Sequence, residues 1–214
     1  TGVPYTASML QFGLRAHDFG RGTADSVAAS IAPYRVPTIQ LALSKALPGE
    51  PTATGMLSPG YARRISNAFS RHGISIAVLG CYINPVHPDA GARSAALARF
   101  EEHLRFARDF GCAVVGTETG SCNADCSFHP ETASEKTFGI LLASLERLVR
   151  IAESYGTIVG VEAVAGQHTI DSITKMSRLL ATIDSPNLQV IYDPVNLLPI
   201  HGLEEPDGSL LDVP

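Results

Sequence analysis

The stretch LQVIYDPVNLLP, Leu188 to Pro199, decides the fold because a buried strand in it ends on a carboxylate. Four of its first five residues are apolar, as in a strand that is covered on both faces. Asp193 then ends the apolar run, and Pro194 cannot donate to a continuing ladder. Two other apolar runs end in the same way, TIVGVEAV with Glu162 and CAVVGTETGS with Glu118.

Short apolar runs of this kind alternate with helical patterns along the chain. The strands are mostly apolar rather than alternating, which indicates a parallel sheet covered on both faces and joined by right-handed crossovers. The sequence predicts six strands and five intervening helices, with the strands at 11–16, 37–43, 74–79, 112–117, 157–163 and 188–192.

Helix ends are marked by capping residues. Ser58 precedes a Pro at the first helical position, and Gly73 follows the last turn of that helix. Thr132 and Glu135 form a capping-box pattern, which predicts that the longest helix begins at Thr132. Asp171 is expected to cap the last helix.

Two architectures fit this order, a doubly wound open sheet and a (β/α)8 TIM barrel. The first strand-to-helix turn has no G-x-G-x-x-G, and polar residues follow nearly every strand, which favours the barrel. A barrel needs eight units, but residues 1–214 hold only about six. We therefore expect a single β/α-barrel domain over 1–214 that lacks the last two units, with a loop over His201–Pro214.

Composition bounds the class of function. The chain has 214 residues, 45% hydrophobic and 17% charged, with a net charge of −5. The acidic balance argues against a nucleic-acid partner, and no apolar run is long enough to span a membrane. Four cysteines are too few for a disulfide scaffold, so we expect free thiols at Cys122 and Cys126 and a cytoplasmic location.

Glu162 and Asp193 end consecutive strands and are expected to be neighbours at one mouth of the barrel. Two nearby carboxylates repel unless one is protonated or a cation lies between them, which suggests a divalent metal. The alternative is that each acid caps a loop or pairs with an arginine. Glu118 is a third acid at this mouth, and its alternative role is a hydrogen bond in the turn at Gly120.

Histidines add candidate polar groups. His17 and His168 are the best candidates because each follows a strand end closely, whereas His87 and His129 lie in longer loops before a proline. No cluster of Lys and Arg marks a phosphate site in the sequence.

Together, the segments FGLRAHDFG, GTETGS, VGVEAV and NLQVIYDPVNLL resemble the xylose-isomerase-like TIM barrels, in the branch of sugar phosphate isomerases and epimerases. The resemblance extends from Phe12 to Leu198. It implies one divalent metal ion (Mn, Mg, Co or Zn) bound by Glu162 and Asp193, while the family's strand-7 His and strand-8 Glu have no counterpart here. It also places His168 and Asn196 at substrate-binding positions.

The resemblance implies a metal-dependent sugar (or sugar phosphate) isomerase or epimerase that transfers a proton through an enediolate. Glu162 would be the catalytic base, with Glu118 and His17 orienting substrate or relaying protons. The partner would be a small sugar-like substrate, and the open sheet edges make a homo-oligomer possible. The alternatives are a lyase like inosose dehydratase, a non-catalytic relative, or a phosphodiesterase like the apurinic-site endonucleases, whose histidine positions hold Gly80 or Cys81, Glu118 and Asn196 here.

Overall fold

A computed structural model describes residues 11–197, so the domain bounds at 1 and 214 and the loop expected over His201–Pro214 lie outside the described part. Six parallel strands form one sheet in the order of the chain, which is the arrangement of a partial TIM barrel. The strands are β1 (Gly13–Arg15), β2 (Thr38–Ala42), β3 (Ser75–Gly80), β4 (Val114–Glu118), β5 (Ile158–Glu162) and β6 (Leu188–Ile191).

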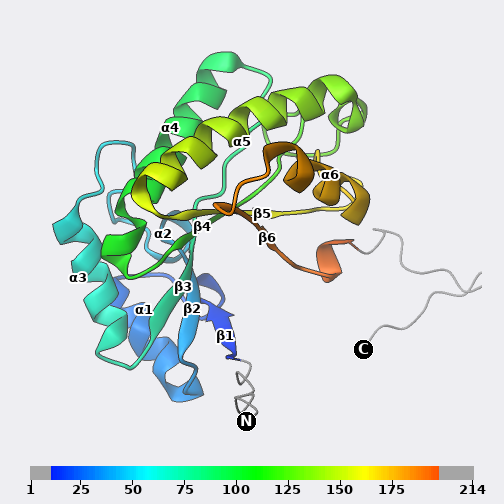
Figure 1. The fold of residues 1–214 in the computed structure, drawn as a ribbon. Helices are drawn as coiled ribbons and strands as arrows, with labels where there is room; N and C mark the ends of the chain where they lie inside the picture. Colours follow the sequence, from blue (N-terminus) through cyan, green and yellow to red (C-terminus); the bar gives the residue numbers. More distant parts are fainter. Residues whose placement is uncertain (1–10, 198–214) are drawn as a thin grey trace, which may run out of the picture.

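Helices connect successive strands and lie along one side of the sheet, and the strand direction turns progressively from β1 to β6 (Figure 1). The fold class predicted from the sequence is therefore confirmed in the described residues. The α-helices are α1 (Ala24–Ile31), α2 (Leu43–Ala46), α3 (Pro59–Ser70), α4 (Ala90–Phe106), α5 (Glu135–Tyr155) and α6 (Ile173–Ile183). Short 3-10 turns are η1 (Ala16–Asp18), η2 (Ala32–Tyr34), η3 (Ala107–Phe110), η4 (Pro130–Ala133) and η5 (Val195–Leu197).

The helix ends follow the capping pattern with two corrections. The Ser58 side chain accepts a hydrogen bond from Tyr61 N at the start of α3, as predicted. The start of α5 was predicted wrongly, because Thr132 lies in η4 and Ser134 is the cap. The cap of α6 is Ser172 and not Asp171, whose carboxylate instead pairs with Lys175 at 2.7 Å. In both cases two capping residues lie close together in sequence.

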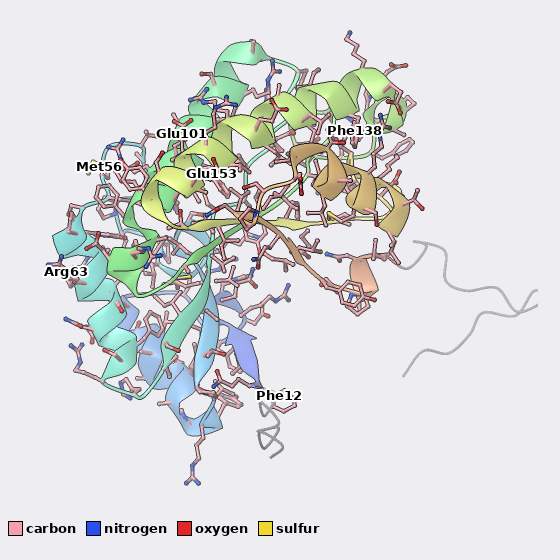
Figure 2. The ribbon with its side chains drawn as sticks, viewed as in Figure 1. Phe12, Met56, Arg63, Glu101, Phe138 and Glu153 are labelled. Atoms are coloured by element: carbon pink, nitrogen blue, oxygen red, sulfur yellow. The ribbon has the colours of Figure 1, made fainter. Side chains whose placement is uncertain are left out.

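The core lies between the helices and the sheet. Its largest fully buried side chains include Phe69 of α3, Phe100 of α4 and Phe110 of η3. Figure 2 shows Arg63, Glu101 and Phe138 on α3, α4 and α5 of the outer layer. Burial of the apolar helix faces, worth about 25 cal/mol per Å², stabilises this layer on the sheet.

The other face of the sheet carries small residues at its centre. Gly116 of β4 pairs in register with Gly160 of β5, and Ile191 of β6 extends over both. A Cβ atom added at Gly116 would lie 2.7 Å from Ile191 Cδ1, and one added at Gly160 would lie 3.0 Å from it. The two glycines therefore make room for Ile191.

Within residues 11–197, no helix combines the length and apolar character needed to cross a bilayer. Cys122 and Cys126 are free thiols, as predicted, and so are Cys81 and Cys112.

Candidate active site

A cavity of about 380 Å³ opens at the carboxyl ends of the strands. Three acidic side chains line this cavity: Glu118 from β4, Glu162 from β5 and Asp193 just after β6. Parallel strands all end at the same edge of a sheet, which brings together residues far apart in the chain. The remaining lining residues are Arg15, Gln40, Lys45, Val78, Tyr82, Ile191, Tyr192, Pro194 and Asn196.

Glu118 and Glu162 pair in register across β4 and β5, so their side chains lie on the same face of the sheet. Glu162 is 8% exposed. Burial, followed by the charges of Glu118 and Asp193, raises the pKa of Glu162 above its ordinary value. The site therefore gathers negative charge where water screens it poorly.

Two local hydrogen bonds orient the acids. Asn196 Nδ2 donates to Glu162 Oε1 at 2.5 Å, which opposes the rise in the pKa of that carboxyl. Asp193 Oδ1 accepts from Val195 N at 2.9 Å, an Asx-type turn that starts η5. Glu162 and Asp193 therefore each use one carboxylate oxygen in a hydrogen bond within the protein.

These carboxylates suit a divalent cation by their chemistry. Hard cations such as Mg²⁺ and Mn²⁺ prefer oxygen donors, and a cation would offset the repulsion that raises the pKa of Glu162. Residues 11–197 contain no group of three or more His, Cys, Asp or Glu side chains placed to hold a metal ion. Glu162 and Asp193 would therefore be part of a coordination shell.

The same cavity is also lined by two cationic side chains, which were not anticipated from the sequence. Arg15 ends β1 and Lys45 lies in α2, 30 residues further along the chain. Gln40 and Tyr82 lie with them, and Gln40 Nε2 donates to the Tyr82 hydroxyl at 2.6 Å. Burial, with Glu162 and Glu118, raises the pKa of Tyr82 to about 12, so its phenol is neutral at physiological pH.

The two predicted histidines lie outside the set of cavity-lining residues. His168 is 3% exposed, and its Nδ1 lies 3.8 Å from Glu118 Oε2, beyond hydrogen-bonding distance. His17 lies in η1 with its Nε2 3.8 Å from Asp18 Oδ1. Burial lowers the pKa of both imidazoles. Each Nδ1 is buried without a hydrogen-bond partner among the described residues.

His87 and His129, the other two loop histidines within residues 11–197, have local roles. His87 Nδ1 accepts from Asp89 N at 3.1 Å, and His129 Nδ1 accepts from Glu131 N at 3.1 Å at the start of η4. The roles predicted for His17 and His168 in substrate binding stay predictions, while Glu118, Glu162, Asp193 and Asn196 share one cavity.

Solved structures with the same fold were found by comparison, whereas a search of curated proteins gave no match. A xylose isomerase domain protein from Planctomyces limnophilus is 20% identical, with a TM-score of 0.63 over 87% of this chain and 63% of that one. A xylose isomerase-like TIM barrel protein from Mycobacterium smegmatis, in complex with magnesium, is 14% identical, with a TM-score of 0.66 over 89% and 66%.

A third structure is D-psicose 3-epimerase with D-tagatose from Clostridium cellulolyticum H10, 14% identical, with a TM-score of 0.63 over 85% of this chain and 62% of that one. The chain thus spans less than two thirds of the length of these three proteins. The family model described as xylose isomerase-like TIM barrel matches residues 38–209, which is most of the chain. On this match, together with the parallel sheet, the protein belongs to the xylose isomerase-like TIM barrel family.

Proposed function

We propose that this chain carries part of the active site of a divalent-metal-dependent isomerase or epimerase acting on a small sugar-like substrate. The observation that carries the proposal is the meeting of Glu118, Glu162 and Asp193 in one cavity, with the pKa of Glu162 raised by burial and by the other two acids. The magnesium complex and the sugar epimerase among the similar structures support the same reading.

Glu162 and Asp193 would hold the ion. When bound, a divalent cation supplies electrostatic stabilisation of negative charge that develops on a carbonyl oxygen. Glu162 would also take the substrate proton, because a carboxylate placed beside the reacting carbon can act as a general base.

The neighbouring residues would keep Glu162 in place for this transfer. Asn196 Nδ2 holds Oε1 of that carboxylate, and Glu162 lines the cavity. The proton would leave a carbon next to the substrate carbonyl, and an enediolate would form on the substrate. Delivery of a proton to the other face of that carbon, by an acid other than Glu162, gives an epimer, and delivery to the neighbouring carbon gives an isomer. Glu118 lies across from Glu162 in register and would hold a substrate hydroxyl.

The test follows exchange of the C–H proton. The chain is incubated in D₂O with Mg²⁺, which is diamagnetic, and a ketose, and loss of the proton signal next to the carbonyl is measured by NMR. We expect exchange that requires metal and falls at least about 100-fold in Glu162→Gln. The control is Glu146→Gln, an exposed residue of α5. Exchange that is unchanged in Glu162→Gln, or its absence from the unsubstituted protein, would overturn the proposal.

The same spectra separate the main alternative. A lyase would also remove this proton, but its product would lack one water and show a new vinylic or deoxy carbon signal. An isomerase or epimerase gives a product that keeps all the carbon and oxygen atoms of the substrate and shows no such signal.

A further inference from the structure

The cavity has two walls of opposite charge. Glu118, Glu162 and Asp193 form the acidic wall at β4 to β6, and Arg15 and Lys45 form a basic wall at β1 and α2. The proposed reaction uses the acidic wall alone. The basic wall therefore calls for its own explanation.

Lys45 is held in position by an aromatic contact. Its Nζ lies 3.9 Å from the ring centroid of Tyr82, and Gln40 Nε2 fixes the hydroxyl of that ring at 2.6 Å. Tyr82 follows β3, and Gln40 lies in the middle of β2. Gln40 of β2 and Tyr82, which follows β3, thus orient the Lys45 ammonium group beside the cavity.

Lys45 forms no ion pair within residues 11–197, although many other cationic side chains there do. Arg15 shares its charge with Asp18, since its Nε donates to Asp18 Oδ2 at 2.8 Å. Its other guanidinium nitrogens make no hydrogen bond within residues 11–197, and Arg15 lines the same cavity as Lys45. None of the three acids Glu118, Glu162 and Asp193 lies within ion-pair distance of Lys45.

We propose that the substrate carries an acidic group, a phosphate ester or a carboxylate, which binds to Lys45 and Arg15 while the carbonyl end of the substrate faces Glu162. This inference rests on the proposed function and narrows its substrate to anionic sugars. Charge-assisted hydrogen bonds from an ammonium and a guanidinium are strong and directional, and they would fix which end of the molecule reaches the base. The cavity of about 380 Å³ is within the range of small-molecule sites.

The competing explanation is structural, with Lys45 serving only to pack on Tyr82. The structural and the anion-binding explanations predict different effects when the charge of Lys45 is removed. A structural lysine would affect stability and all ligands equally, whereas an anion-binding lysine would affect only ligands that carry the acidic group. Lys45→Arg keeps both the charge and the aromatic contact, and Lys45→Gln removes the charge.

The experiment compares three ketoses that differ at one carbon. D-fructose is neutral, D-fructose 6-phosphate carries a phosphate, and D-fructuronate carries a carboxylate at the same position. Dissociation constants are measured by titration calorimetry with the 214-residue chain in the presence of Mn²⁺. We expect at least one anionic ketose to bind roughly fivefold or more tightly than D-fructose. Preference for the phosphate identifies a sugar phosphate, and preference for the carboxylate identifies a sugar acid.

The variants decide the cause. Lys45→Gln should reduce the anionic preference to within about twofold, Lys45→Arg should restore most of it, and Lys136→Gln on α5 should leave it unchanged. Melting temperatures measured alongside confirm that each variant folds. Equal binding of all three ketoses, binding of none, or a preference that survives Lys45→Gln would each overturn the inference.

Failure of the proposed function gives a different result. If an anionic ketose binds through Lys45 but its C–H proton never exchanges with D₂O, the substrate assignment stands and the reaction is wrong. If D-fructose exchanges its proton as well as the anionic ketoses do, the reaction stands and the anionic preference is wrong.

Discussion

Glu118 and Glu162 end adjacent parallel strands at the same register position, so the two carboxylates lie side by side on one face of the sheet. A pair of like charges at such a site opposes folding unless a proton or a cation relieves it. Asp193 adds a third charge from the next strand. The arrangement therefore lowers the stability of the metal-free protein in favour of ligand binding, as at many catalytic sites.

Glu162→Gln should stabilise the metal-free chain at neutral pH. Because the folded-state pKa of Glu162 is raised, this carboxyl stabilises the folded chain below its ordinary pKa, and that contribution is lost as pH rises through the folded pKa. We expect the variant to melt a few degrees higher at pH 8, about the effect of 1 kcal/mol in a chain of this size. The advantage should shrink at pH 5. A lower melting temperature at pH 8 would show that the ionised carboxylate is stabilising.

Asn196→Ala should weaken metal binding through Glu162. The amide donates to Glu162 Oε1 at 2.5 Å and thereby favours the ionised form. Its loss should raise the pKa of Glu162 further, move the onset of Mn²⁺ binding to higher pH and lower the affinity at pH 6 by about 10-fold. Mn²⁺ electron paramagnetic resonance measures the binding. Gln189→Ala, an exposed position on β6, is the control and should not move the curve.

The buried imidazole of His103 should contribute to a loss of protein stability as the pH falls from neutral into mild acid. It is 4% exposed, and its Nδ1 lies 2.8 Å from the carbonyl oxygen of Arg99. Burial lowers the pKa of this imidazole, so the folded state binds fewer protons than the unfolded chain. Stability is therefore complete above about pH 6.5 and falls as pH drops through the lowered folded-state value.

Urea unfolding at pH 8 and pH 5 tests this. His103→Gln should be less stable at pH 8 by about 1–3 kcal/mol and should show a shallower loss toward pH 5, because His17 and His168 still contribute. The control is His72→Gln, at an exposed residue after α3. An unchanged slope in His103→Gln would assign the acid sensitivity elsewhere.

Gly120→Ala should lower the free energy of unfolding by more than a substitution at the protein surface would. Gly120 has φ of 66°, and an added Cβ would overlap Asn84 Oδ1 and lie 2.9 Å from Pro85 Cδ. The Gly120 carbonyl also accepts from Thr169 N at 2.9 Å, which links the loops after β4 and β5. We expect a loss of more than about 2 kcal/mol in chemical unfolding.

A matched glycine gives the comparison for that substitution. Gly139 lies in α5 with no atom within 4 Å of an added Cβ, so Gly139→Ala should stabilise by up to about 1 kcal/mol. Equal effects of the two substitutions would show that the turn at Gly120 tolerates a side chain.

The sequence predicted the parts of the fold that depend on local chemistry. Ser58 caps α3, and the apolar runs that end in Glu162 and Asp193 meet at one cavity. The caps of α5 and α6 were predicted wrongly because Thr132 competes with Ser134 and Asp171 with Ser172, and local pattern does not rank such close candidates.

The basic wall was missed for a different reason. Arg15 and Lys45 are ordinary surface residue types, and only the pairing of β1 with β2 brings them to one cavity. The same limit applies to His17 and His168, because a position near a strand end does not fix the direction of the side chain. Tertiary geometry, which no single-sequence pattern contains, decides these assignments.

Ile191 packs over Gly116 and Gly160, so the side-chain sizes at these positions on β4, β5 and β6 depend on one another. A methyl group gained at either glycine would displace the end of the Ile191 side chain, which lies two residues before Asp193. A change of volume in the middle of the sheet therefore reaches the end of β6. Any redesign of this interior has to treat positions 116, 160 and 191 as one packing unit.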